Sequence, residues 1–417
     1  MEQHRGPRIW KELKRFFFKN LTAIFCVVGA VAVTYTVTYT SCVRAAQQTM
    51  AIFNETGVDI NKIAQVALLY QAGYVGGELD SQAMTDYALY GLVQGTGDKY
   101  GTYVNETDFA RMMDDTQGQL VGIGVNVTYR ADQNTIRVMS VMEGSSAQAA
   151  GIQPNDYLVA VDGQQLSDIG YYAFVQAITG EEGTEVTVDV ERGGQLLSFT
   201  LQRTRIELQS VTVKEVVEGI PCVTITEFNE KTPEQFAAAM QQVNATANLR
   251  GLVFDLRNNS GGNAEAVGAV LDSILPECTV YRLVNKQGEE TMRYDSDAQT
   301  VLPSGVPVVV LCNSNTASAA ELFTASLQDL KLATVVGETT YGKGTGVQII
   351  GLGDGSGLVM STELYYTPAD RNLEGVGVIP DVEVVMTDEE MAMYYDLTLE
   401  QDTQMQKALG VIYTGGA

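Results

Sequence analysis

The stretch VPVVVLCNSNTASAAELFTASLQDL, residues 306–330, decides the fold. Its uninterrupted apolar run, VVVLC, is typical of a strand buried on both faces, and the apolar spacing of SAAELFTASLQDL is that of a helix. The same order of strand, turn and helix occurs in GLVFDLRNNSGGNAEAVGAVLDSIL (251–275), and CVTITEF (222–228) precedes the helical TPEQFAAAMQQVNA (232–245). This alternation predicts an α/β domain over residues 206–390, with a largely parallel sheet covered by helices.

The flanking segments predict further elements. VQIIGLGDGSGLVMSTELYYT (347–367) is strand-rich and suits antiparallel pairing, and PADRNLEGVGVIPDVEV (368–384) is a loop rich in Gly and Pro. Short β-branched runs with turn signals between them predict a separate β-rich module over residues 118–205. In it, SSAQAAG (145–151) predicts a short helix that ends at a glycine. Residues 45–115 have helical apolar spacing, and a helical tail is expected over 391–417.

The first 43 residues predict a membrane anchor. Residues 1–20 carry six basic and two acidic side chains, and no charged residue occurs from Asn20 to Val43. An uncharged stretch of this length suits a transmembrane helix, which needs about 20 residues, and the basic flank predicts a cytoplasmic N-terminus. We expect a cytoplasmic tail (1–20), a single-pass anchor in the cell membrane (21–43) and an extracytoplasmic body. A cleaved signal peptide is the alternative, although the apolar stretch is long for one.

The composition excludes several function classes. The formal charge is −25, and because the tail contributes +4, the remaining residues carry −29. Such an acidic body disfavours nucleic-acid binding, which needs a basic face. The acidity favours either basic partners or simple solubility. The five cysteines include no C-x-x-C pair, and no H-x-x-x-H spacing exists, so neither a zinc site nor any other cofactor is expected.

Ser318 and Lys343 are the residues with the clearest chemical potential. The chain has a single histidine, His4, in the basic tail. A Ser-His-Asp relay is therefore excluded in the body, and a lysine has to accept the proton if a serine is activated. Ser318 follows a strand and begins a helix, where unsatisfied N–H groups, that of Ala319 first, can stabilise an oxyanion. The alternative is a capping box formed by Ser318 and Glu321.

Lys343 also has two interpretations. GETTYGKG (337–344) nearly matches a phosphate-binding loop, but Gly344 replaces the metal-binding hydroxyl and a strand instead of a helix follows. As a general base, the lysine must be neutral, so its pKa must fall from about 10.4 to about 7–8, which corresponds to roughly 4 kcal/mol. Burial among apolar residues lowers the pKa of a lysine in this way, and the following strand is apolar.

The combination of these motifs resembles a known family. TASAAE (316–321), YGKG (341–344) twenty-five residues later and DLRNNSGG (255–262) upstream are similar to the carboxyl-terminal processing proteases, tail-specific serine peptidases of the S41 family. GDKYGTY (97–103), TEFNEKTPEQF (226–236) and YYTPADRNLEGVGVIPDVEV (365–384) resemble further parts of that family. GIGV (122–125) with SSAQAAGIQPNDYLVAVDG (145–163) resembles a PDZ domain. The resemblance covers residues 60–390 and implies a ClpP/crotonase-like peptidase core with an inserted PDZ domain.

The resemblance also implies roles for individual residues. Ser318 corresponds to the nucleophile and Lys343 to the general base, and the N–H groups of Gly261 and Ala319 to the oxyanion hole. Gln348 is similar to the glutamine that orients the lysine, but it follows Lys343 by five positions where the family has four. Ser260, Thr316 and Ala320 are milder departures from the family pattern.

The PDZ-like module predicts how substrates are recruited. Its loop Gly122, Ile123, Gly124 and Val125 can present backbone N–H groups to a C-terminal carboxylate, while an extended peptide adds to the sheet edge. We therefore expect a membrane-anchored serine endopeptidase that cleaves extracytoplasmic proteins near their free C-termini, with peptide or protein substrates and a possible homo-oligomer. The rival hypothesis is a PDZ scaffold on an inactive protease core. The sequence names neither the physiological substrate nor an activating partner.

Overall fold

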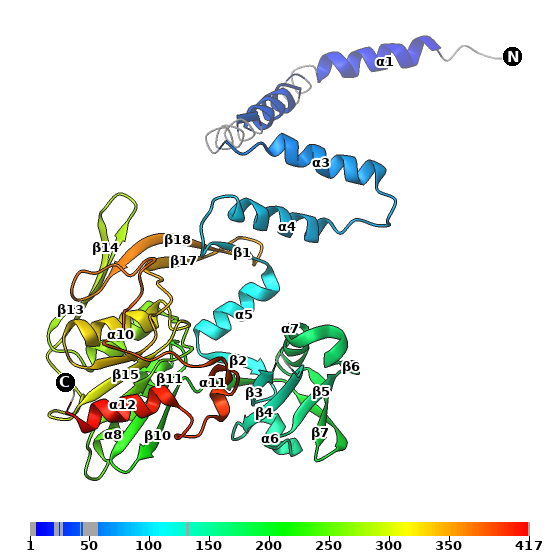
Figure 1. The fold of residues 1–417 in the computed structure, drawn as a ribbon. Helices are drawn as coiled ribbons and strands as arrows, with labels where there is room; N and C mark the ends of the chain where they lie inside the picture. Colours follow the sequence, from blue (N-terminus) through cyan, green and yellow to red (C-terminus); the bar gives the residue numbers. More distant parts are fainter. Residues whose placement is uncertain are drawn as a thin grey trace. The chain divides into compact units, whose positions relative to one another are not determined.

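The computed structural model describes residues 6–20, 25, 28–41, 43–44, 57–130 and 133–415 (Figure 1). The chain divides into two compact units, Met1–Met84 and Thr85–Ala417. The first unit contains α1 (Gly6–Lys19), α3 (Ile60–Gly73) and the beginning of α4 (Ser81–Gln94). Residues 57–116 are largely helical, which agrees with the helical region expected from the sequence, whereas residues 45–56 lie outside the described part.

The transmembrane helix expected over residues 21–43 is unsupported. Residues 28–41 are helical, but among the described residues no helix is both long and apolar enough to cross a membrane. Residues 21–24, 26–27 and 42 of the expected span lie outside the described part of the chain.

The β-rich module forms a six-stranded sheet with two helices. The sheet order is β3-β4-β5-β7-β8, with β6 paired to β5, and its pairs are antiparallel. Gly151 adopts a left-handed conformation that ends α6, as the sequence predicts. The bounds are β3 (Val125–Arg130), β4 (Thr135–Val141), α6 (Ser146–Ala150), β5 (Tyr157–Val161), β6 (Gln164–Gln165), α7 (Leu166–Ile178), β7 (Glu185–Arg192) and β8 (Gln195–Gln202).

Short elements flank this module on both sides in the chain. Strand β2 (Gln119–Gly122), before the module, and strand β9 (Thr204–Glu207), after it, pair antiparallel to each other, so the module is inserted between two adjacent segments. The bounds are β1 (Thr102–Val104), α5 (Glu106–Thr116), β2 (Gln119–Gly122) and β9 (Thr204–Glu207).

The second half of the chain forms the expected α/β domain. Its sheet has the order β10-β11-β12-β15-β16-β19, and every pair except β10–β11 is parallel. The bounds are β10 (Val211–Val217), β11 (Ile220–Ile225), α8 (Thr232–Asn244), β12 (Leu252–Asp255), α9 (Ala264–Asp272), β15 (Val308–Cys312), α10 (Ala319–Asp329), β16 (Thr334–Gly337) and β19 (Val382–Glu383).

The alternation of side chains along β15 explains the layers. Val308, Val310 and Cys312 pack into the core beneath α8, α9 and α10. Val309 and Leu311 belong to a second core on the other face, which α12 (Thr403–Tyr413) covers. Every residue of β15 is buried, which is why its sequence is apolar without alternation. The sheet therefore lies between two layers of helix, and α12 is visible beside β15 in Figure 1.

The C-terminal tail is not one helix. Thr387 and Glu390 form a capping box that begins α11 (Asp388–Ala392), a short 3₁₀ turn follows at Tyr394–Asp396, and the Asp402 side chain caps α12 by accepting from the Met405 N–H. Two successive caps thus divide the helical tail that the sequence predicts.

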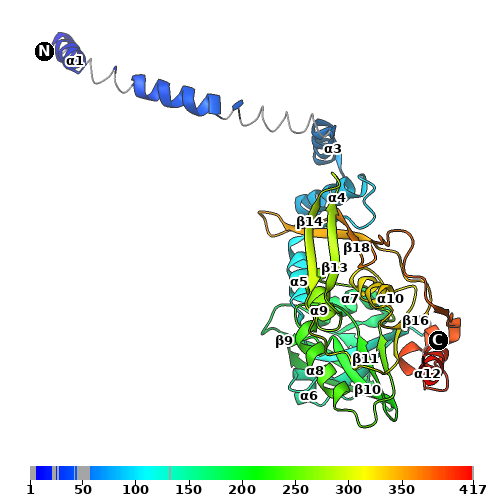
Figure 2. The same ribbon diagram turned by 90° about the vertical axis from the view of Figure 1, so that its left-hand side faces the viewer.

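A second sheet contains only antiparallel pairs among the described residues. Its order is β1-β18-β13-β14, and β17 also pairs with β18 (Figure 2). The antiparallel β17–β18 pair confirms the prediction for residues 347–367. The bounds are β13 (Cys278–Asn285), β14 (Glu290–Ser296), β17 (Thr345–Gly351) and β18 (Gly357–Tyr366).

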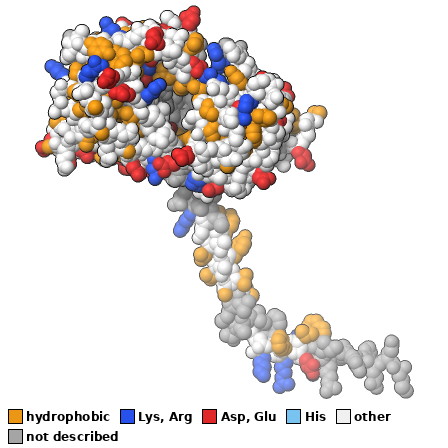
Figure 3. Space-filling view, turned by 90° about the horizontal axis from the view of Figure 1, so that it is seen from below, with side chains coloured by type: hydrophobic (Ala, Val, Ile, Leu, Met, Phe, Trp, Pro, Cys, Tyr) orange, Lys and Arg blue, Asp and Glu red, His pale blue; other side chains and the backbone are white. Residues whose placement is uncertain are grey.

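The charged surface is mixed in sign. On the face drawn in Figure 3, acidic and basic side chains are interspersed among neutral and apolar ones. The strong net negative charge is therefore not gathered into one acidic patch on this face, which agrees with a contribution to solubility.

Candidate active site

Ser318 lies at the turn between β15 and α10. Its backbone has φ +56° and ψ −119°, values that a residue with a side chain rarely adopts. Such a conformation costs about 1–3 kcal/mol and is found mainly at functional sites, where a sharp strand-to-helix turn exposes a nucleophile. The surrounding helix end and turn must hold the serine in this geometry.

The buried carboxylate of Glu321 provides much of that support. Its Oε2 accepts the N–H groups of Ser318 and Lys343, each at 2.8 Å. Its Oε1 accepts the Gly342 N–H at 2.8 Å and the Thr340 hydroxyl at 2.5 Å. Burial raises the pKa of Glu321, and these four donors oppose that effect. One carboxylate thus fixes the backbone of both residues that the sequence singles out, so the capping and functional interpretations of Ser318 and Glu321 are compatible.

Tyr365 of β18 makes a second connection between the same two residues. The Tyr365 hydroxyl lies within hydrogen-bond distance of the Ser318 carbonyl oxygen, at 3.2 Å, and of the Lys343 carbonyl oxygen. Its ring is buried, and burial raises the pKa of Tyr365 well above the ordinary value, so the hydroxyl remains a donor. Ser318 and Lys343 are therefore neighbours in space, although twenty-five positions separate them in the sequence.

The Gly-Gly turn after β12 packs directly against Ser318. A Cβ atom at Gly261, whose φ is +107°, would lie 2.7 Å from the Ser318 Cβ and 3.0 Å from the Ala319 nitrogen. Only glycine permits this approach. The structure thus brings together Gly261, Ser318 and Ala319, three of the residues expected at the site.

The donors of the expected oxyanion hole are not equally free. The Gly261 N–H donates to the Asn259 side chain at 2.8 Å, an Asx-turn that the sequence did not reveal. Within the described residues, the N–H groups of Gly262 and Ala319 have no acceptor. The free donors beside Ser318 therefore come from Ala319 and from the second glycine of the turn, while an anion at Gly261 would share that N–H with Asn259.

Lys343 is half-buried at the start of β17. Burial lowers the pKa of its amine, whereas the carboxylates of Glu374, Asp98 and Glu321, in that order, raise it. The Nζ atom lies 4.7 Å from the centroid of the Tyr100 ring. The net shift is downward, which is the direction that a general base requires.

Gln348 is not joined to Lys343 by a hydrogen bond. It is an exposed residue of β17, and none of the hydrogen bonds among the described residues joins its amide to Lys343. Lys343 itself precedes the first residue of β17, and the pairing of β17 with β18 shifts register between Gly346 and Val347. The role that the family resemblance gives to Gln348 therefore has no supporting contact among the described residues.

Three further residues lie around Ser318 and Lys343. Tyr100, Tyr365 and Glu374 belong to segments that resemble the family, 97–103 and 365–384, but no motif singles them out. Tyr365 is buried and the other two are half-buried. No local sequence signal predicts their contacts, because Tyr100 and Glu374 are 274 positions apart.

Two buried cysteines offer no rival nucleophile. Burial raises the pKa of the Cys312 thiol to about 12 and also raises that of Cys222, so both remain protonated and inert near neutral pH. Both are free thiols that pack in the core.

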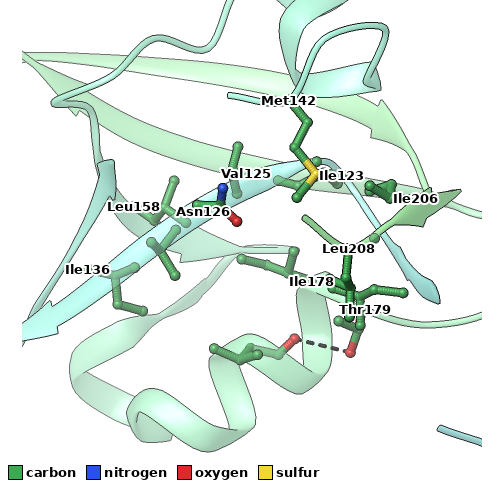
Figure 4. A pocket seen from close by; sticks show the side chains of 15 residues that line it. Ile123, Val125, Asn126, Ile136, Met142, Leu158, Ile178, Thr179, Ile206 and Leu208 are labelled. Atoms are coloured by element: carbon green, nitrogen blue, oxygen red, sulfur yellow. Dashed lines mark hydrogen bonds between the residues drawn. The ribbon is translucent and has the colours of Figure 1, made fainter. Parts of the chain in front are cut away.

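A separate groove opens in the β-rich module between β3 and α7 (Figure 4). It has a volume of about 100 Å³ and is lined mainly by apolar side chains, among them Ile123, Val125, Val175 and Ile178. Strand β3 is at the edge of its sheet. Among the described residues, the N–H groups of Ile123 and Gly124 have no acceptor, whereas their carbonyl groups accept from Ala147 and Met142. The expected loop at residues 122–125 therefore lies at one end of an apolar groove with free donors.

Comparisons with known proteins agree with this architecture. A model described as peptidase family S41 matches residues 219–384, and a PDZ domain model matches residues 110–191. A carboxy-terminal-processing protease from Bartonella bacilliformis is 31% identical over 324 residues, which are 77% of this chain and 74% of that protein. A carboxyl-terminal-processing protease from Synechocystis sp. is 28% identical over 376 residues, 88% of this chain and 86% of that protein. A solved photosystem II D1 C-terminal processing protease has a TM-score of 0.48 at 24% identity, with 85% of this chain and 90% of that chain covered.

The chain is thus a serine-type peptidase with a mixed α/β peptidase domain and a PDZ domain. It belongs to the carboxyl-terminal processing proteases of peptidase family S41. The family resemblance and the enzyme class expected from the sequence are both confirmed.

Proposed function

We propose that this protein is an endopeptidase that uses a Ser318–Lys343 dyad to cleave proteins near their C-termini. The observation that carries the proposal is the shared support of the two residues: Glu321 accepts the N–H of each, and Tyr365 contacts the carbonyl oxygen of each. A dyad needs its nucleophile and base in a fixed relation, and these bonds supply it. The only histidine, His4, lies outside the described residues and 314 positions before Ser318.

The proposed reaction proceeds through an acyl-enzyme. Neutral Lys343 accepts the Ser318 hydroxyl proton as Oγ attacks the scissile carbonyl carbon. The N–H of Ala319 and the glycine turn at Gly261 stabilise the oxyanion, and Gly262 offers a further free donor. The Lys343 ammonium then protonates the leaving amine. Water, deprotonated by Lys343, hydrolyses the ester and regenerates Ser318. Burial lowers the pKa of Lys343, which increases the fraction of the amine that is neutral and able to accept the proton.

The PDZ domain supplies a binding site for substrate tails. An extended peptide along the free edge of β3 would place its terminal carboxylate at the unpaired N–H groups of Ile123 and Gly124. The groove beside that loop is apolar, so the proposed tails end in apolar side chains.

The experiment is a cleavage assay on the full chain. Fluorescein-labelled casein serves as an unfolded protein substrate, and a fluorophosphonate probe reports acylation of Ser318 independently of substrate length. The proposal predicts that Ser318→Ala and Lys343→Ala each lose casein hydrolysis by a factor on the order of 10⁴ or more. Parent-level hydrolysis in either variant would refute the dyad.

The rival hypothesis, a PDZ scaffold on an inactive core, makes a different prediction. The parent protein would then bind peptides through the groove yet show neither casein hydrolysis nor probe acylation. The strained backbone of Ser318 favours the enzyme, because a helix cap alone needs no left-handed conformation.

The proposal also includes a location and an assembly state. The uncharged stretch from Asn20 to Val43, preceded by the basic tail, favours attachment to the cell membrane with the body outside. A protein attached by a spanning helix stays in the membrane in alkaline carbonate and is released only by detergent. Release of the full chain by alkaline carbonate alone would contradict such an attachment. Association with a second copy is tested by the mass of the purified protein in light scattering.

A further inference from the structure

Lys343 is covered by a tyrosine from a distant segment. Tyr100 lies between α4 and β1, and its ring centroid is 4.7 Å from the Lys343 Nζ atom. An ammonium group over an aromatic face is stabilised by about 0.5–2 kcal/mol. The ring therefore both shields the amine from water and favours one position of the lysine side chain.

Glu374 ties that tyrosine to the backbone of the lysine. Its Oε1 accepts the Tyr100 hydroxyl at 3.1 Å. Its Oε2 accepts the Gly344 N–H at 2.8 Å and the Thr345 hydroxyl at 2.6 Å. A Cβ atom at Gly344 would lie 2.2 Å from the Glu374 nitrogen, so the glycine after Lys343 is what allows the two segments to approach. One carboxylate thus connects the residues that follow Lys343 to the ring that covers its amine.

We propose that Tyr100 and Glu374 are the positioning residues of Lys343, in the place that the sequence pattern assigns to Gln348. The proposal rests on the Ser318–Lys343 dyad. Gln348 is exposed in β17, and its side chain makes no hydrogen bond within the described residues. Tyr100 and Glu374 instead hold the backbone and the side chain of the lysine from two sides.

The charges around Lys343 give the proposal a measurable signature. The amine is influenced by the carboxylates of Glu374, Asp98 and Glu321, all of which raise its pKa against the effect of burial. Burial raises the pKa of Tyr100 and of Tyr365, so both phenols are neutral at working pH. Lys99, whose amine donates to the Tyr100 hydroxyl, remains charged. Among the carboxylates, Glu374 has the largest effect on Lys343.

The sign of the expected change follows from these charges. A general base works when neutral, so kcat/KM rises with pH through the pKa of Lys343. Replacement of Glu374 by glutamine removes the largest of the carboxylate effects that raise this pKa. The acid limb of the profile should therefore move to lower pH, even as kcat at its plateau falls about 10-fold because the lysine is less well held. A purely structural defect would lower kcat without moving the limb.

The experiment compares pH profiles of casein hydrolysis by the full chain. Glu374→Gln is tested beside Tyr100→Phe, which keeps the ring over the amine but loses the bond to Glu374. The matched control is Glu363→Gln, which removes a carboxylate from the neighbouring strand β18, where Glu363 accepts from Thr291. We expect a several-fold loss of kcat with unchanged KM in Tyr100→Phe and a parent-like profile in the control.

Separate outcomes distinguish the two hypotheses. Parent-like kcat and acid limb in both Glu374→Gln and Tyr100→Phe, with Ser318→Ala and Lys343→Ala inactive, would overturn the positioning role and leave the dyad intact. A loss of kcat in Gln348→Ala as large as that in Glu374→Gln would also overturn it. Full activity in Lys343→Ala would instead refute the dyad itself. Circular dichroism on each variant identifies misfolding. If Glu374→Gln fails to fold, the positioning role is tested by the kcat of Tyr100→Phe, which removes only one partly buried hydroxyl.

Discussion

Replacement of Glu321 should lower both the stability of the protein and its activity. Its carboxylate accepts three backbone N–H groups and one hydroxyl inside the domain. In Glu321→Ala the Thr340 hydroxyl can rotate, but the N–H groups of Ser318, Gly342 and Lys343 lose their acceptor. An unsatisfied buried donor costs about 1–3 kcal/mol, so the free energy of unfolding should fall by about 3 kcal/mol or more. Because Ser318 and Lys343 lose a shared anchor, kcat should also fall, on the order of 100-fold.

Glu321→Gln provides the graded comparison. Its amide oxygen can replace Oε2 and keep the bonds to Ser318 and Lys343, while its NH₂ group donates to the Thr340 hydroxyl. Only the Gly342 N–H then lacks an acceptor, so we expect a loss of about 1–3 kcal/mol and a much smaller loss of kcat. The matched control is Glu390→Ala, since Glu390 is the other capping-box glutamate, exposed at the start of α11. It should cost at most about 1 kcal/mol and leave kcat unchanged.

The measurements are urea unfolding, casein hydrolysis and the rate of fluorophosphonate acylation. Acylation by the small probe reports the geometry of Ser318 without a contribution from substrate binding. If Glu321→Ala unfolds within about 0.5 kcal/mol of the parent and acylates at a similar rate, the shared carboxylate does not organise the site and the reasoning is wrong.

Three further outcomes are expected. Lys343→Met should abolish hydrolysis yet raise the free energy of unfolding at pH 7, because burial lowers the pKa of the lysine and the charged amine therefore destabilises the fold below that pKa. This gain in stability should shrink as the pH approaches about 10.4, the pKa of a lysine in the unfolded chain. A variant less stable than the parent at pH 7 would contradict the prediction. Asp402→Ala should cost about 3–5 kcal/mol in urea unfolding, because the buried Arg257 loses one of its two carboxylate partners and α12 loses its cap; a cost below about 1 kcal/mol would count against this. Val175→Asp should abolish binding of a fluorescent peptide with an apolar C-terminus, measured by anisotropy, while probe acylation of Ser318 stays within about twofold; intact binding would remove the groove from the proposed function.

The sequence predicts the parallel sheet well because burial on both faces leaves a strong signal. Every residue of β15 is buried, and its run of β-branched residues is unambiguous. The hairpin of β13 and β14 gave no such signal. Its strands are partly exposed and carry Arg282, Glu290 and Arg293, so apolar alternation is weak and the pairing depends on contacts with β18.

The residues of the candidate site also differ in how far the sequence predicts them. Ser318, Lys343 and the Gly-Gly turn are local motifs, and each is recognisable within a few residues. The contact between Tyr100 and Glu374 spans 274 positions and depends on how β1 and the loop after β18 come together, which no local pattern encodes.

The second helical layer has a consequence for the synthesis of the protein. α12 closes one face of the central sheet, and Asp402 at its beginning pairs with Arg257, four positions before Gly261, the glycine that packs against Ser318. On the ribosome, residues 402–413 emerge well after the nucleophile, because chains grow from the N-terminus. Until they do, Arg257 has only Asp255 as its carboxylate partner and the face of β15 formed by Val309 and Leu311 is bare. The pairing of Arg257 with Asp402 and the burial of this face of the sheet can therefore form only after α12 has been synthesised.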